Sequence, residues 1–477
     1  PSFLRPAARA AVLAVAGALA LAGAPALSPA APPVQPGPAP AAAAPARLDP
    51  LPAAELQARV RRDYRLTRAD LRRQLGERLR DVTDAEFDRW LAEGRFERRE
   101  IDGEERFLHV SVSNLLFRHR ELEARRRRPE ATAALERALL GNARAIRAAA
   151  RQSGTPYVLP KRLQVRMTLT VATNAVPAGE TIRAWLPIPR RLPFQDGFEV
   201  LAGGDRPRAV DVPDSWARAA YFEFPAPPDA APSVTLRYAY TAHGVSFDLD
   251  PERSRPAPAS SPELRPWLGE EAHLVFSPAM RELGRRIAGA ETNQVRLARA
   301  FYQWIGDHLR YSYAPEYSTV ANLGEMCRAQ GYGDCGMEAF VFMTLCRLHG
   351  IPARWQSGWS LFPGAETIHD WCEIHLAPWG WVPVDPYLAI YAMQYTDHLA
   401  EAERRELRDF HFGGLSQYRL VANSAHAQPL APAKRWPRSD TVDFQRGELE
   451  TASGNLYFDR FDHHLKWEEI PVTPGTR

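Results

Sequence analysis

Apolar residues along the chain follow two different periods, and the changes of period divide it into regions. Between residues 51 and 157 they recur every three or four positions, as at Leu71, Leu75 and Leu79. This spacing places them on one face of a helix. The sequence therefore predicts a helical region at 51–157.

From residue 160 the period becomes two, as at Leu163, Val165 and Met167. Alternation of this kind is typical of strands that have one buried face. Proline and glycine interrupt these runs at short intervals, which indicates turns between strands. The region at 160–248 is therefore predicted to be a small antiparallel β-sandwich.

A helical pattern returns after a stretch rich in Pro and Ser, with Leu297, Phe301 and Ile305 on one face. A second apolar helix and several short strand-like runs follow it. This mixture predicts an α+β domain at 263–400.

The first residues have the three parts of a secretory signal. Arg5 and Arg9 precede an apolar run at 11–24, and small residues follow that run. We expect a signal peptide at 1–26, and hence a secreted or periplasmic protein. An uncleaved membrane anchor is the alternative, but a membrane span needs about 20 apolar residues. Because the run is shorter, no stable membrane insertion is expected after signal cleavage.

Residues 27–50 are mostly Ala and Pro, a composition that favours extended conformations and does not form a core. We expect a linker there. Lys and Arg total 60 and Asp and Glu total 57, which leaves a net charge of +3. A nucleic-acid partner is therefore not expected.

Four cysteines in 477 residues are too few for a disulfide scaffold, even in an oxidising compartment. If one of them is a free thiol, the other three form at most one bridge, and the sequence does not select the pair.

One cysteine stands in a chemically distinctive place. The stretch GYGDCGMEAF at 331–340 puts Cys335 where a glycine-rich loop becomes a helix. Amide groups and the helix dipole at a helix N-terminus stabilise a thiolate, which is the reactive form of cysteine. The negative charge of Asp334 opposes this, unless Asp334 caps the helix.

A histidine and an aspartate follow Cys335 in the order that a nucleophilic triad requires. His369 begins a predicted strand, and Asp385 ends the next strand just before a proline. Thiol, imidazole and carboxylate on a helix start and two neighbouring strands can form a Cys-His-Asp triad. A zinc site at His369, Cys372 and His375 is the alternative, but alternation points Cys372 away from both histidines. No metal and no cofactor is expected.

Four ordered motifs add a resemblance to this chemistry. They are GDC at 333–335, CRLHGIPAR at 346–354, HDWCE at 369–373 and GWVPVDP at 380–386. Together they resemble the transglutaminase-like superfamily, and most closely its bacterial secreted members.

The resemblance implies a papain-like α+β fold in which Cys335, His369 and Asp385 are the catalytic triad. The expected fold class is thus a multidomain α+β protein. Its papain-like transglutaminase core, the catalytic domain at 263–400, is preceded by the β-sandwich and the N-terminal helical region. The tail segments DFQRGE at 443–448 and GNLYF at 454–458 resemble the C-terminal extension of the bacterial secreted members. The resemblance therefore also implies a C-terminal extension at 401–477 that packs on the catalytic domain. Animal members have Gln and Trp beside the nucleophile, where this chain has Asp334 and Gly336, and this departure argues against protein cross-linking.

We therefore expect an exported cysteine-triad enzyme that hydrolyses an amide bond through a thioester acyl-enzyme. Its substrate would be a protein, a peptide or a cell-wall peptide. The backbone amide of Cys335 and the side chains of Gln330 and Tyr332 are candidate donors to the oxyanion. Two alternatives remain: acyl transfer to an amine, and a non-catalytic scaffold that binds a peptide or glycan with a vestigial triad.

Overall fold

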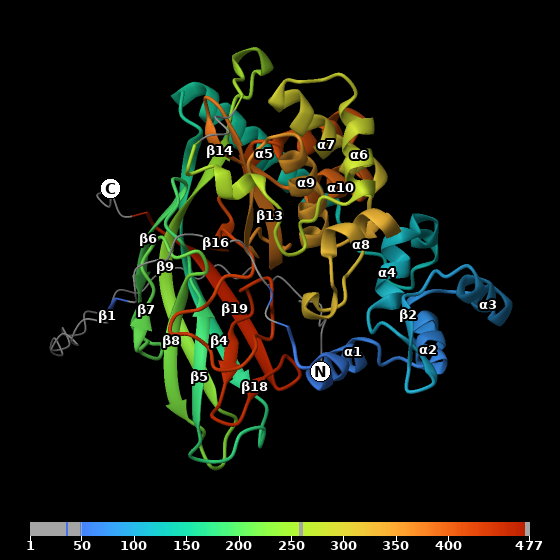
Figure 1. Ribbon diagram of the computed structural model, residues 1–477, viewed down its shortest axis with the longest axis vertical. Helices are drawn as coiled ribbons and strands as arrows, with labels where there is room; N and C mark the ends of the chain where they lie inside the picture. The colour runs from blue at the N-terminus through green and yellow to red at the C-terminus, as the bar shows by residue number, and fades with distance from the viewer. Residues whose placement is uncertain (1–34, 37–47, 49, 257–260, 473–477) are drawn as a thin grey trace, which may run out of the picture.

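The computed structural model describes residues 35–36, 48, 50–256 and 261–472. Figure 1 shows most strands in one half of the molecule, helices in the other half, and the first helices along its outer edge. The predicted signal peptide at 1–26 lies outside the described residues, as does almost all of the predicted linker at 27–50. Among the helices that are described, none combines the length and the apolar character that a bilayer span needs.

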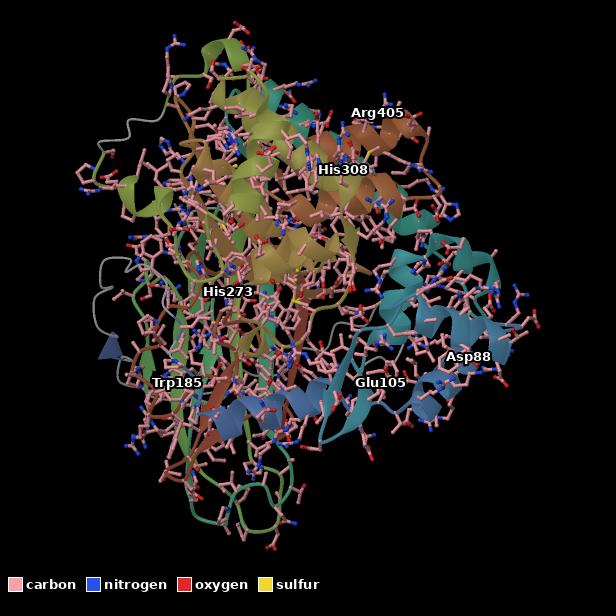
Figure 2. All side chains as sticks on the ribbon, turned by 45° about the vertical axis from the view of Figure 1, so that its right-hand side comes forward. Asp88, Glu105, Trp185, His273, His308 and Arg405 are labelled. Atoms are coloured by element: carbon pink, nitrogen blue, oxygen red, sulfur yellow. The ribbon has the colours of Figure 1, made fainter. Side chains whose placement is uncertain are left out.

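The N-terminal helical region has a core of its own. Leu71, Leu75 and Leu79 are fully buried in it, as their spacing predicts. Thr67 begins the second helix with a capping box, in which Asp70 returns the hydrogen bond. Figure 2 shows Asp88 and Glu105 on this region, away from the strands of the sandwich. Its elements are α1 (Ala53–Asp63), α2 (Arg68–Arg78), α3 (Asp84–Ala92), β2 (Arg98–Ile101), β3 (Glu104–Phe107), α4 (Ser111–Arg118), η1 (Arg120–Arg125) and α5 (Ala133–Ser153).

This region is attached to the segment that precedes Cys335. The side chain of Asn114 donates to the backbone oxygen of Tyr313 at 2.9 Å and accepts from its backbone nitrogen at 2.8 Å. The Asp63 carboxylate accepts from the backbone nitrogen of Glu316 at 3.0 Å and from the hydroxyl of Thr319 at 3.2 Å. Buried polar groups that are paired in this way hold a loop in one conformation.

Two sheets form the predicted sandwich, and their strands are antiparallel except for the parallel pair of β1 and β7. Leu163, Val165, Met167 and further alternate residues of its first long strand are fully buried between them. One sheet has the order β1-β7-β8-β5-β17-β18, and the other β15-β9-β4-β19 with β6 beside β9. The strands before residue 250 are β1 (Gln35–Pro36), β4 (Tyr157–Val171), β5 (Thr181–Pro187), β6 (Gln195–Val200), β7 (Ala209–Val210), β8 (Ala219–Pro225) and β9 (Ser233–Ser246).

The C-terminal extension supplies the remaining strands of these two sheets. They are β15 (Gly414–Leu415), β17 (Glu448–Glu450), β18 (Asn455–Leu456) and β19 (Phe461–Ile470). β19 pairs with β4 from Phe461 opposite Val171 to Ile470 opposite Arg162. The buried indole of Trp185 (Figure 2) donates to the backbone oxygen of Pro432 at 2.9 Å. The extension was expected to pack on the catalytic domain, and in the structure it also completes the sandwich.

The α+β region places one buried helix against a four-stranded sheet of order β14-β13-β12-β16. This helix is α9 (Cys335–Leu348), and it is apolar on nearly every side, as a fully enclosed helix should be. The other helices of this region are η2 (Pro251–Arg253), η3 (Arg265–Leu268), α6 (Pro278–Ala288), α7 (Gln294–His308), η4 (Tyr317–Thr319), α8 (Leu323–Gln330), α10 (Pro386–Gln394) and α11 (Glu401–Phe410). Its strands are β10 (Arg310–Tyr311), β11 (Tyr332–Gly333), β12 (Ala353–Ser360), β13 (Thr367–Leu376), β14 (Gly380–Val384) and β16 (Arg419–Asn423).

The expected multidomain α+β class is thus confirmed, whereas the limits of the individual domains stay predictions. Helical, sandwich and mixed α+β regions occur in the expected order along the chain. The strands that the extension adds to both sheets make the sandwich larger than the sequence indicated.

One glycine of the four-stranded sheet provides a test of this packing. A Cβ atom at Gly358 would overlap the backbone oxygen of Leu420 on the neighbouring strand β16. We expect Gly358→Ala to reduce the free energy of unfolding by about 1–3 kcal/mol, because the strands must separate locally. Thermal unfolding followed by circular dichroism measures this change.

Gly141→Ala is the matched control, because nothing lies within 4 Å of a Cβ atom there. This position is inside helix α5, where alanine is favoured over glycine by up to about 1 kcal/mol. An unchanged melting temperature for Gly358→Ala would contradict the close approach of β12 and β16.

Candidate active site

Cys335 is the first residue of α9, and the structure explains the role of the aspartate before it. The Asp334 carboxylate is the N-cap and accepts from the backbone nitrogen of Met337 at 3.1 Å. The hydroxyl of Tyr317 donates to the same oxygen at 2.7 Å. Burial raises the pKa of Asp334 to about 6, although both hydrogen bonds act to lower it. The sequence left open whether Asp334 caps the helix that carries the thiol, and in the structure it does.

His369 and Asp385 are hydrogen-bonded to each other. His369 lies on β13, and Asp385 follows β14, the next strand of the sheet. The imidazole Nε2 and the carboxylate Oδ2 are 2.8 Å apart. Asp385 also caps α10 through the backbone nitrogen of Leu388 at 3.3 Å, which fixes the orientation of the carboxylate.

Arg419 of β16 completes this group, because its Nη2 atom donates to Oδ2 of Asp385 at 2.6 Å. Burial acts to raise the pKa of Asp385, but His369 and Arg419 outweigh it and hold the pKa well below 3.8. Asp385 is therefore a carboxylate at neutral pH. Burial is also the main reason that the pKa of His369 lies below 6.5, with Asp385 opposing the shift.

The contact with Asp385 also determines the tautomer of His369. A carboxylate accepts hydrogen bonds, so the neutral imidazole carries its proton on Nε2. The lone pair is then on Nδ1, which is the nitrogen available to take a proton from a thiol. The ring is held in place by Trp371, stacked at 5.7 Å, and by the edge-on ring of Tyr387 at 5.4 Å.

The hydrogen bond of Cys335 goes to the residue next to His369. Its sulfur lies 3.6 Å from Oδ2 of Asp370, and the backbone N–H of Asp370 is directed to the sulfur as well. β14 pairs with β13 only from Cys372 to Leu376, so the sulfur lies beside a part of β13 that β14 does not cover. Within the described residues no hydrogen bond joins Cys335 directly to His369.

The charges around the sulfur favour a protonated thiol. Burial raises the pKa of Cys335 well above 9.0, and the negative charges of Asp370 and Asp334 add to this shift. The resting pair is therefore a neutral thiol and a neutral imidazole.

Gln330, the candidate oxyanion donor, ends helix α8. Its side-chain nitrogen donates to the backbone oxygen of Tyr332 at 2.8 Å. This contact holds the loop just before Cys335, and the role of Gln330 toward an oxyanion stays a prediction. The catalytic roles of Cys335, His369 and Asp385 likewise stay predictions.

Gly336 allows the residues around the thiol to approach so closely. A Cβ atom there would overlap the hydroxyl of Tyr317 and lie 2.8 Å from Oδ2 of Asp370. The glycine that separates this chain from the animal enzymes thus makes room for a tyrosine and a carboxyl group at the start of α9.

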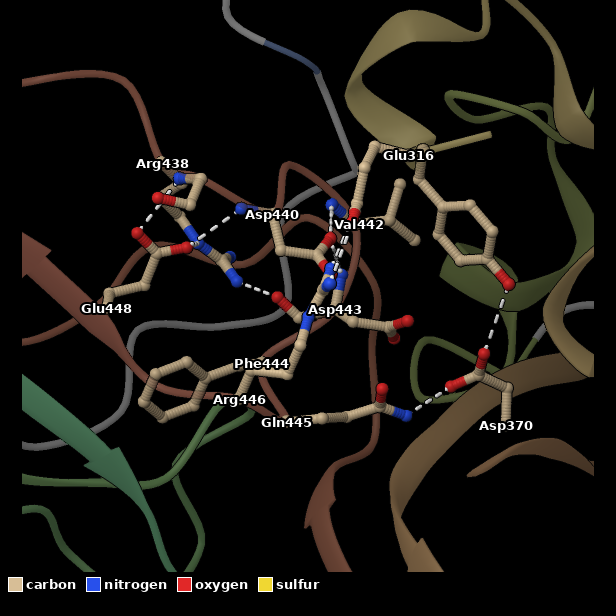
Figure 3. Close-up of polar contacts among 12 residues, drawn as sticks. Glu316, Asp370, Arg438, Asp440, Val442, Asp443, Phe444, Gln445, Arg446 and Glu448 are labelled. Atoms are coloured by element: carbon tan, nitrogen blue, oxygen red, sulfur yellow. Dashed lines mark hydrogen bonds and ion pairs between the residues drawn. The ribbon is translucent and has the colours of Figure 1, made fainter. Parts of the chain in front are cut away.

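Sequence reasoning missed four residues of this site, namely Asp370, Tyr317, Arg419 and Gln445. The side-chain nitrogen of Gln445 donates to Oδ1 of Asp370 at 2.6 Å (Figure 3). The sequence carries a signal for Asp370 alone, because a charged residue inside a strand with apolar neighbours needs a partner. The other three are distant in sequence and only the fold brings them here.

No group of three or more His, Cys, Asp or Glu side chains in the described part of the chain has an arrangement that could hold a metal ion. The alternative zinc site gains no support, because the thiol of Cys372 donates to the backbone oxygen of Val384 at 3.3 Å.

The solved structures that are similar to this chain include two bacterial proteins. A protein from Cytophaga hutchinsonii described as a "Putative Cysteine Protease" has 12% identity and a TM-score of 0.40, over 66% of this chain and 93% of its own. The periplasmic domain of TgpA from Pseudomonas aeruginosa has 16% identity and a TM-score of 0.28, over 54% of this chain and 95% of its own. Similarity of this extent carries no argument about the reaction.

Among curated proteins, none matches the chain. The family comparison concerns the part of the chain from α6 to the start of α10, which contains Cys335, His369 and Asp385. Residues 281–386 match the model of the transglutaminase-like superfamily, and this part of the protein is a transglutaminase-like domain.

Proposed function

We propose that this protein is an exported cysteine acyl-transfer enzyme that hydrolyses an amide bond in a protein, a peptide or a cell-wall peptide. The observation that carries the proposal is the buried hydrogen bond of 2.8 Å between His369 on β13 and Asp385 after β14. Cys335, at the start of α9, lies beside β13 as well. A cysteine at this place in a transglutaminase-like domain supports nucleophilic catalysis. The secreted or periplasmic location rests on the signal-like pattern of residues 1–26.

The reaction follows from the protonation states of the resting site. The Cys335 sulfur attacks the amide carbonyl carbon while its proton moves to Nδ1 of His369, and a tetrahedral oxyanion forms. The carbon–nitrogen bond then breaks, and the imidazolium gives its proton to the leaving amine. A thioester to Cys335 remains.

Water completes the cycle by attacking the thioester carbon while Nδ1 of His369 accepts a proton. The carbon–sulfur bond breaks, and the imidazolium returns this proton to the sulfur. Asp385 stays ionised in both halves of the cycle and stabilises the imidazolium, since Arg419 keeps its carboxylate charged. We expect backbone N–H groups at the start of α9 to bind the oxyanion.

The first prediction concerns which thiol reacts. Cys327, Cys346 and Cys372 are fully buried, whereas Cys335 is partly exposed. We expect iodoacetamide to modify Cys335 first in the native protein, and to lose this preference in urea. Mass spectrometry of the labelled peptides gives the order of modification. Equal rates for all four thiols in the folded protein would argue against a nucleophile.

The second prediction concerns turnover of a peptide library or of purified cell-wall peptides. We expect Cys335→Ala to abolish cleavage, and His369→Ala and Asp385→Asn to lower kcat by about 10²–10⁴-fold. Product analysis with an added primary amine separates hydrolysis from amine transfer. Cys372→Ala is the matched control and should retain activity, because this thiol lies on the other side of β13 from His369. Equal activity of Cys335→Ala and wild type would overturn the proposal.

The third prediction concerns pH. His369 must be unprotonated to take the thiol proton, and its pKa lies below 6.5. Activity should therefore be retained as the pH falls through 6.5 and be lost only below it, as the imidazole becomes protonated. The thiol pKa lies above 9.0, so no loss from thiol ionisation is expected between pH 7 and 9. Measurement of kcat/KM from pH 4 to 10 tests this, and a midpoint of the acid limb above pH 6.5 would contradict it.

A further inference from the structure

The chain between β16 and β17 contacts the candidate site at His369 and Asp370 of β13. We call residues 438–448 the C-terminal loop. Its polar side chains Ser439, Asp443, Gln445 and Glu448 are at most 4% exposed. Figure 3 shows Gln445 directed toward Asp370, and Glu448 directed toward the backbone at Asp440. Buried polar groups are costly unless they are paired, so their partners indicate what the loop holds in place.

The loop is closed by its own carboxylates. Glu448 accepts from the backbone nitrogens of Ser439 and Asp440, each at 2.9 Å. Asp440 accepts from the backbone nitrogens of Val442 at 3.0 Å and Asp443 at 2.8 Å. These bonds fix the backbone on both sides of the turn (Figure 3).

An ion pair attaches the loop to the segment before Cys335. Arg446 donates from both terminal nitrogens to the Glu316 carboxylate, at 2.8 and 2.7 Å. Bidentate pairs of this kind are strong and directional. Glu316 is followed by Tyr317, whose hydroxyl contacts Asp334 and Asp370. Through Glu316 and Tyr317 the loop is therefore connected to Asp334 and Asp370, the two carboxyl groups near the thiol.

Gln445 is the residue of the loop that reaches the site. Its single side-chain nitrogen donates to the backbone oxygen of His369 at 3.0 Å and to Oδ1 of Asp370 at 2.6 Å. Both amide hydrogens are thus used on two consecutive residues of β13. The indole of Trp359 in turn donates to the backbone oxygen of Gln445 at 3.1 Å, which fixes the glutamine itself.

The other oxygen of Asp370 faces the thiol. Oδ2 accepts from Tyr317 at 3.2 Å and from Cys335 at 3.6 Å. Asp443 of the loop is hydrogen-bonded to the Asp370 carboxyl group and accepts from the indole of Trp355 at 3.1 Å. Asp370 is therefore the link between the C-terminal loop and the nucleophile.

We infer that Gln445 is a positioning residue that holds the Asp370 carboxyl against the Cys335 thiol, so that the resting thiol hydrogen-bonds to Asp370 until the substrate is bound. This inference rests on the proposed function. When the sulfur attacks, its proton passes to Nδ1 of His369, and Asp370 only loses a hydrogen bond. The loop thus keeps the free enzyme in a protonated, weakly nucleophilic state.

Several titratable groups surround the sulfur, and the charge of Asp370 has to be considered among them. They are Asp334 before α9, Glu338 within it, Tyr311, Tyr317, Asp370 of β13, Asp443 of the loop and Tyr387 of α10. Burial is the main cause that raises the pKa of both Asp370 and Asp443. The negative charges of Asp334 and Asp440 add to the shift of Asp370, and those of Asp370 and Asp440 add to the shift of Asp443. After burial, Asp370 is the largest contribution that raises the pKa of Cys335.

The test measures the pH dependence of iodoacetamide labelling of Cys335 in the full chain. Asp370→Asn replaces the carboxyl group that raises the pKa of Cys335 by an amide of the same shape. The thiol pKa should therefore fall, and labelling at pH 7 should become about tenfold faster for each unit. Gln445→Glu replaces a donor by a carboxylate facing Asp370, so labelling at pH 7 should become slower. The effect of Gln445→Glu should disappear when Asp370→Asn is also present.

Gln195→Glu is the matched control, because Gln195 is also fully buried and also donates to two backbone oxygens, those of Arg190 and Val421. Its labelling profile should equal that of the wild type. Shifts of the same sign in Asp370→Asn and Gln445→Glu, or unchanged profiles in both, would overturn the inference. If Gln445→Glu does not fold, Asp370→Asn alone tests the inference, and an unchanged labelling profile of that variant overturns the inference.

Labelling and turnover give separate answers. The labelling profile reports the state of the thiol whether or not the protein cleaves an amide. Loss of the expected shifts with normal turnover would overturn the inference and leave the proposed function standing. The expected shifts without turnover of any peptide would support the thiol contact and count against the proposed function.

Discussion

The buried carboxylate of Asp385 is the group around which the catalytic sheet is organised. A negative charge without water needs positive or donor groups on it, and here His369 and Arg419 supply them from two other strands. The first helical turn after Asp385 adds a backbone donor. The carboxylate of Asp385 therefore connects β13, β14, β16 and α10. Removal of either partner would leave a buried charge uncompensated, which is more costly than the loss of a surface ion pair.

A second group of buried carboxyl groups, Asp370 and Asp443, contacts β13 as well, and its pKa values are shifted in the opposite direction to that of Asp385. Asp370 and Asp443 share a hydrogen bond and have raised pKa values, whereas Asp385 has a lowered one. Adjacent residues His369 and Asp370 point to opposite faces of the strand, so each face has its own electrostatic character. His369, the proposed base, is hydrogen-bonded to Asp385, and the thiol of Cys335 is hydrogen-bonded to Asp370.

The sequence predicted those features that depend on local pattern. Alternation at Leu163, Val165 and Met167 indicated a strand with one buried face, and these residues are fully buried in β4. The order of Cys335, His369 and Asp385 indicated neighbouring elements, and the structure places His369 beside Asp385. Gln330 and the three triad candidates were all found in this way, because each lies next to a recognisable helix or strand boundary.

Long-range contacts were beyond the reach of such patterns. Gln445 is 75 residues from Asp370, and Arg419 is 34 residues from Asp385, so no period or motif connects them. The strand β19 alternates in burial like any exposed edge strand, and nothing local indicates that its partner is β4. The extension was for this reason assigned to the catalytic domain alone. Register between distant strands is determined by tertiary packing rather than by propensity.

The pairing of β19 with β4 has a consequence for biosynthesis. Residues 461–470 pair with residues 162–171, and the sheet cannot gain this strand before the ribosome has made the roughly 300 residues that separate the two strands. Contacts of such sequence separation form slowly, since a long loop must close first. The N-terminal helical region has a core of its own and can begin to fold while synthesis continues. Gln445 likewise reaches Asp370 only after the C-terminal loop at 438–448 has been made.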